Sequence, residues 1–140
     1  MNPPLIYRKA LELCELSRAI ASYVTHNKDL LKLYQSNSLR DIIADSLLTD
    51  TILIQQQIDR AEKSSNPVVR FRTTRFISVM IRNLQGYTNG LEHHGVNEKE
   101  YLNLLRIEIK SFKKAFKKWS KTLGKHNGEG NWGYQDYLGY

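Results

Sequence analysis

The 140-residue chain contains one cysteine, three prolines and no apolar run long enough to cross a bilayer. Cys14 alone cannot form an internal disulfide, which argues against a fold held together by disulfide bonds. A membrane-spanning helix needs about 18 or more apolar residues in succession. The opening Met1-Asn2-Pro3-Pro4 also lacks the cationic segment and apolar stretch of a secretory signal. We therefore expect a cytoplasmic protein that does not enter a membrane.

The sequence also lacks the residue spacings that usually carry catalysis. It has no glycine-rich phosphate loop, no His-Glu-x-x-His, no cysteine pair for zinc and no nucleophile elbow. For Cys14 we favour a small buried side chain over a nucleophile. For His93 and His94 we favour a helix C-terminus over a metal site, and for Asp50 a hydrogen bond within the fold over a general base. The sequence predicts a non-enzymatic protein without a cofactor or metal.

Acidic residues are scarce in two segments. The chain holds 21 Lys and Arg against 14 Asp and Glu, a formal net charge of +7. Residues 67–96 carry four arginines against Glu92 alone, and residues 102–126 carry eight basic residues against Glu108 alone. A charge asymmetry of this kind is typical of proteins that bind nucleic acids or acidic surfaces.

Hydrophobic side chains recur every three or four residues in four segments, as amphipathic helices require. The pattern predicts helices over 5–24 and 39–63. A third helix begins near Arg70, carries its hydrophobic stripe from Phe76 to Leu91 and stops near Gly95. A fourth is capped by Asn97 and Glu100. The seam of the fourth consists of Leu102, Leu105, Ile109, Phe112, Phe116, Trp119 and Leu123.

Two shorter features accompany the predicted helices. Asn27 is a candidate cap for a short helix within 25–38, after which Ser38 is the candidate N-cap of the next helix. Gly86 and Gly90 weaken the third helix by up to about 1 kcal/mol each, so they mark either close helix contact or a frayed end.

With no strand pattern and short connections, the expected fold is all-α: an antiparallel up-down-up-down four-helix bundle over residues 1–125. Residues 126–140 alternate glycines with Trp132 and three tyrosines and have no helical period. We expect them to form a mobile tail, or one that orders when its aromatic side chains dock on a partner.

The fourth helix carries far more cations than an ordinary solvent-exposed helix surface. Its cations extend along about 30 Å of helix with almost no acidic residues to pair with them, and such an array can neutralise phosphates. The third helix adds three arginines near its start. The predicted nucleic-acid-binding residues are Arg70, Arg72, Arg75, Arg106, Lys110, Lys113, Lys114, Lys117, Lys118 and Lys121.

Three other interpretations of this surface stay open. The lysines could simply solubilise an exposed face, which we disfavour because an ordinary face mixes charges of both signs. An oligomeric scaffold that binds an acidic protein is the main alternative to RNA binding. A membrane-surface helix ranks last, because the seam of the fourth helix fits helix packing better than lipid.

The segments Tyr7-Arg8-Lys9-Ala10-Leu11-Glu12, Phe76 to Leu84 and Glu108 to Ser120 resemble a family of small bacterial four-helix-bundle proteins. The family includes proteins encoded in intervening sequences of large-subunit rRNA genes and the accessory variability determinant of diversity-generating retroelements. The resemblance covers residues 5–125. The Ser-x-Pro-Ala-Asn-Ile-Ala-Glu-Gly stretch of the rRNA-encoded branch is missing, since residues 45–60 differ, and this favours the retroelement branch.

The resemblance implies a homo-oligomer, specifically a homopentamer, with a basic surface. It also implies association with a reverse transcriptase and its template RNA, or an RNA/DNA hybrid, during mutagenic cDNA synthesis. The residues themselves indicate only that aromatic side chains exceed what a minimal bundle core needs, which favours self-association.

Overall fold

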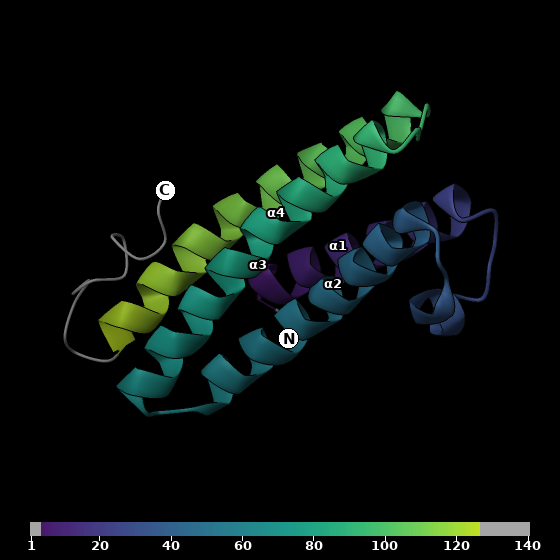
Figure 1. Ribbon diagram of the computed structural model, residues 1–140. Coiled ribbons are helices and arrows are strands. Elements are labelled where there is room, and N and C mark those ends of the chain that lie inside the picture. Colours follow the sequence, from purple (N-terminus) through teal and green to yellow (C-terminus); the bar gives the residue numbers. More distant parts are fainter. Residues whose placement is uncertain (1–3, 127–140) are drawn as a thin grey trace.

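The computed structural model describes residues 4–126 and places most of them in helices (Figure 1). The long helices are α1 (Leu5–Val24), α2 (Leu39–Lys63), α3 (Pro67–His93) and α4 (Lys99–His126), and a short 3₁₀ helix, η1 (Leu30–Gln35), lies between α1 and α2. No strand occurs within this part of the chain. The all-α prediction is therefore confirmed for residues 4–126, whereas the predicted Gly/Tyr/Trp tail lies outside them from residue 127 onward.

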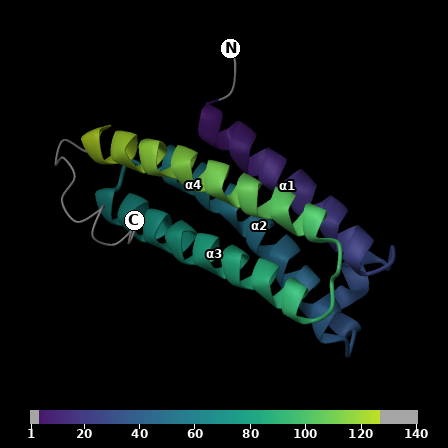
Figure 2. The ribbon, with the colours of Figure 1, turned by 90° about the horizontal axis from the view of Figure 1, so that it is seen from above.

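Each long helix packs against two others. α1 contacts α2 and α4, and α3 contacts α2 and α4, so the four helices surround one shared core (Figure 2). η1 packs against α2. This arrangement gives every long helix one side for the core and leaves its remaining surface outside, as the amphipathic pattern requires.

The seam predicted on α4 is confirmed in full. All seven of its large side chains are buried, and Phe112 and Phe116 are among the largest side chains with no exposed surface. Burial of each such side chain stabilises the fold by roughly 1.5–3 kcal/mol. The register of α4 is thereby fixed, and this fixes which of its lysines face outward.

The turn between α3 and α4 explains why α4 begins later than predicted. Gly95 has φ +89°, and the Val96 N–H donates to the Leu91 carbonyl at 3.1 Å, which is a Schellman ending with Val96 buried. Because this turn uses residues up to Val96, α4 begins at Lys99, and the Glu98 carbonyl accepts the N–H of Tyr101. The expectation that Asn97 caps α4 is wrong.

The segment between α1 and α2 also differs from the prediction. Asn27 lies at φ +61° in the turn that follows α1 and does not cap η1. The Asp29 carboxylate accepts the Leu31 N–H instead, at 3.0 Å. Asparagine tolerates the left-handed conformation better than most residues, so it suits the end of α1. Ser38 is the N-cap residue of α2 but makes no capping hydrogen bond through its side chain.

In the first half of α3, the core face carries threonines, whereas the sequence pattern predicted that Phe76 would be buried there. Phe76 is 45% exposed, whereas Thr73 and Thr74 are buried and donate their hydroxyls to backbone carbonyls of the preceding turn. Their polar groups are satisfied within α3, so they can occupy the core face.

Further along α3, Gly90 faces α2 so closely that an added Cβ would lie 3.1 Å from Ile43 Cδ1, while Gly86 faces open space.

Candidate nucleic-acid interface

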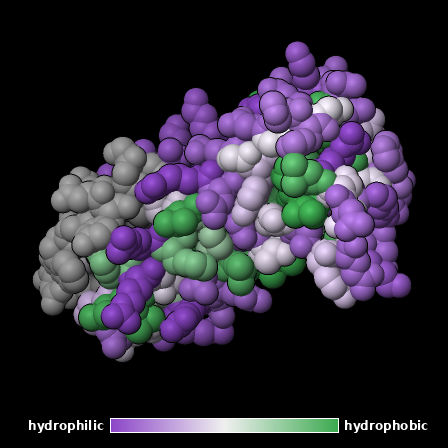
Figure 3. Space-filling view, viewed as in Figure 1, coloured by the Kyte–Doolittle hydropathy of each residue, from purple (hydrophilic) through white to green (hydrophobic). Residues whose placement is uncertain are grey.

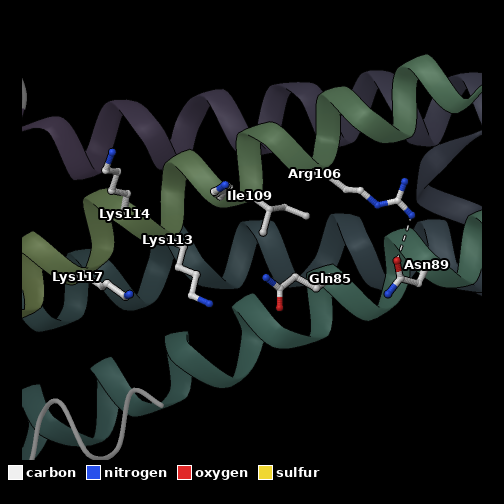
Figure 4. A pocket seen from close by; sticks show the side chains of 8 residues that line it. Gln85, Asn89, Arg106, Ile109, Lys113, Lys114 and Lys117 are labelled. Carbon is white, nitrogen blue, oxygen red and sulfur yellow. Dashed lines mark hydrogen bonds between the residues drawn. The ribbon is translucent and has the colours of Figure 1, made fainter. Parts of the chain in front are cut away.

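The lysines of α4 lie on one broad face of the helix, outside its buried seam. Lys110, Lys114, Lys118 and Lys121 are exposed, and Lys113 and Lys117 are partly buried. In Figure 4, Lys113 and Lys117 extend from α4 toward α3. These lysines are three or four residues apart, which matches the helical repeat. Their side chains therefore form rows along α4 instead of one compact cluster.

A groove of about 620 Å³ lies between α3 and α4. Ile109 contributes apolar surface to it, and Gln85 and Asn89 contribute amides from α3 (Figure 4). The described residues that line it are Gln85, Asn89, Arg106, Ile109, Lys110, Lys113, Lys114 and Lys117. Five of these eight residues are cations and none is an anion, so the groove attracts negative charge.

The electrostatics of the groove appear most clearly at Lys113. Partial burial lowers the pKa of Lys113 below its ordinary value, and the nearby charges of Lys117 and Arg82 lower it further. Positive charge from both helices is therefore concentrated around Lys113. Arg82 was missing from the predicted site. It follows Arg75 by seven residues and thus lies on the same side of α3, a spacing that could have indicated both.

Arg106 has partners on α3. Its guanidinium donates to the Glu92 carboxylate at 3.2 Å and to the Asn89 side-chain oxygen at 3.1 Å. It also donates to Asn103 on α4 at 3.3 Å. Arg106 therefore joins α3 to α4 and closes one end of the groove.

The exposed lysines differ from Arg106 in this respect. Within residues 4–124, Lys110, Lys114, Lys118 and Lys121 form no ion pair with a carboxylate. The one acidic residue in the middle of α4, Glu108, instead lies near Glu12 and Lys9 of α1, and burial followed by the repulsion of Glu12 raises its pKa. Within the described residues, no carboxylate pairs with these four lysines, so this surface is strongly positive.

The three predicted arginines of α3 do not stay together. Arg70 donates from Nε to the carbonyls of Ser64 at 2.6 Å and Ala61 at 3.3 Å, so it binds the C-terminal end of α2. Arg72 lines a separate hollow of about 310 Å³ beside Arg60. Only Arg75 lies on the side of α3 that carries Arg82. The structure brings the α4 cations together and separates Arg70 and Arg72 from them.

The residues considered for catalysis or metal binding, Cys14, Asp50, His93 and His94, occupy positions that serve the fold. Cys14 is buried, and Asp50 accepts a hydrogen bond from the Tyr87 hydroxyl at 2.9 Å, as predicted. Burial, and then this bond to Asp50, raises the pKa of Tyr87 to about 12. His93 ends α3 and His94 is its C-cap. Among the described residues, no group of three or more His, Cys, Asp and Glu side chains could hold a metal ion.

Hydrophilic surface predominates on the face seen in Figure 3, and several separate apolar patches interrupt it. None of the helices within residues 4–126 combines the length and the apolar character needed to span a membrane.

Comparison with protein-family models, with curated proteins and with solved structures finds no match to this chain.

Proposed function

We propose that this chain is a non-enzymatic accessory protein that binds RNA through the basic surface formed by α4 and the facing side of α3. The observation that carries the proposal is the set of exposed lysines on α4 without carboxylate partners, Lys110, Lys114, Lys118 and Lys121. Phosphates of a nucleic-acid backbone supply the missing negative charge, and the release of their counterions drives binding.

The energetics of α4 support this proposal. Lys110 and Lys114, and likewise Lys114 and Lys118, are four residues apart, and like charges at this spacing destabilise a helix by about 0.2–0.5 kcal/mol per pair. The seam of α4 compensates for this cost by burial, so the cations need not contribute to folding. Their arrangement is better explained by an external polyanion than by stability.

The resemblance to the retroelement accessory branch extends the proposal to architecture and partners. We place the helices in an antiparallel up-down-up-down bundle, which the short connections and the contacts between consecutive helices support. Exposed Leu11, Leu104 and Ile107 support self-association, for which the family resemblance suggests a pentamer. The partners would be a reverse transcriptase and its template RNA.

Fluorescence anisotropy with a labelled RNA tests the proposal. Changing Lys110, Lys114, Lys118 and Lys121 to glutamine should weaken binding at least about tenfold, because four phosphate contacts are lost. The matched control changes four exposed cations on α1, η1 and α2 and removes the same charge: Arg8, Arg18, Lys32 and Lys63. Circular dichroism checks that both variants are folded.

The outcomes separate RNA binding from the acidic-protein scaffold. Equal loss in both variants would mean that net charge alone is responsible, and wild-type affinity in the α4 variant would refute the proposal. Polyglutamate serves as an acidic polypeptide competitor. If it displaces the RNA at equal charge concentration, the surface is a general acidic-protein site instead.

A further inference from the structure

The chemistry of the α3–α4 groove distinguishes between forms of nucleic acid. We propose that the groove seats the backbone of an A-form duplex that contains RNA, and that it does not bind an unstacked single strand. This inference rests on the proposed function and specifies its ligand. Three features of the described residues carry it: the absence of stacking platforms, the rigid cation rows and a pair of amides.

Among residues 4–126, no aromatic side chain lines the groove. Phe112, Phe116 and Trp119 of α4 are buried in the core, so their rings cannot stack on bases. Among the described residues, the exposed Phe and Tyr side chains lie elsewhere: Tyr23 and Tyr101 pack on each other with ring centroids 4.6 Å apart, Tyr34 belongs to η1, and Phe76 lines the α2–α3 hollow. Proteins that bind single strands usually stack bases on aromatic rings.

The cations of the groove are held on a straight, rigid element. From Arg106 to Lys117 the lining extends over eleven residues, or about 16 Å of helix. The buried seam fixes the rotation of α4, so the positions from which these side chains extend are fixed as well. Such rows match the regular phosphates of a duplex, which is recognised through its shape and backbone.

Two amides face the cations across the groove. Gln85 and Asn89 lie one turn apart on α3, and both line the groove opposite α4 (Figure 4). The Asn89 oxygen accepts a hydrogen bond from Arg106 at 3.1 Å, which leaves its NH₂ group as a donor for a ligand. Neutral donors and acceptors beside a row of cations suit a 2′-hydroxyl next to a phosphate, and this hydroxyl distinguishes RNA from DNA.

Competition binding with four ligands of one length and related sequence tests the inference: duplex RNA, an RNA/DNA hybrid, duplex DNA and a single-stranded RNA without self-complementarity. Duplex RNA and the hybrid should compete about tenfold better than single-stranded RNA and more strongly than duplex DNA. Gln85→Ala should reduce the preference for RNA-containing duplexes without changing the affinity for duplex DNA. Gln56→Ala, at an exposed position of α2, is the matched control and should change neither.

The outcomes distinguish this inference from the function on which it rests. If single-stranded RNA competes as well as duplex RNA, or if Gln85→Ala leaves the RNA-to-DNA preference unchanged, the inference is wrong and RNA binding stands. If none of the four ligands binds, the proposed function fails and the inference fails with it.

Discussion

Replacing Lys113 with methionine should make the protein more stable and bind RNA less tightly. Lys110 precedes Lys113 by three residues and Lys117 follows it by four, and Arg82 adds positive charge from α3. Removal of two like-charge pairs on the helix should stabilise the fold by about 0.5–1 kcal/mol, or raise Tm by roughly 2–4 °C. Methionine retains an unbranched side chain and similar helix propensity, so packing should change little.

Thermal unfolding followed by circular dichroism measures this effect at neutral pH. The gain should shrink at high salt, which screens repulsion. It should also shrink as the pH rises from the lowered pKa of Lys113 toward the ordinary 10.5, because the folded wild-type loses the unfavourable charge over that range. Lys63→Met breaks the 2.8 Å ion pair with Asp59 and should act in the opposite direction. A lower Tm for Lys113→Met would refute the reasoning.

Two further predictions concern α2–α3 packing. Tyr87→Phe removes the donor to Asp50 and should destabilise the fold by about 1 kcal/mol at neutral pH. Because the pKa of Tyr87 is raised to about 12, wild-type stability should fall between pH 10 and 12 in urea titrations, and an equal fall in the Phe variant would contradict this. Gly86→Ala should stabilise by up to about 1 kcal/mol. Gly90→Ala should gain less, because its Cβ meets Ile43 Cδ1, and equal gains in Tm would contradict the close packing.

The α4 seam could be predicted from sequence because it depends on a local repeat. Residues from Leu102 to Leu123 follow one helical period, and burial of this one face determines the register without reference to any neighbour. The predicted boundaries of α1 and α2 agree with the structure for the same reason. Asn97 was misassigned as a cap because the Schellman turn around Gly95 depends on the ending of the preceding helix.

The composition of the site depended on contacts between helices, which the sequence does not encode locally. Arg70, Arg72 and Arg75 are close in sequence, yet they extend to the α2 terminus, the α2–α3 hollow and the Arg82 side of α3, respectively. A 100° step per residue separates such neighbours. The seven-residue spacing places Arg82 on the Arg75 side of α3, but the packing of α3 beside α4 is needed to show that this side lies near the lysines.

The salt dependence of binding tests the central claim most directly. With duplex RNA between 50 and 200 mM salt, phosphate contacts from the four groove lysines together with Lys118 and Lys121 predict a slope of about −5.4 in a plot of log association constant against log salt concentration. Changing Lys110 and Lys114 to glutamine should reduce the steepness by about 2. A flat response of the wild-type protein, or an unchanged slope in this variant, would contradict the claim that these lysines bind a polyanion.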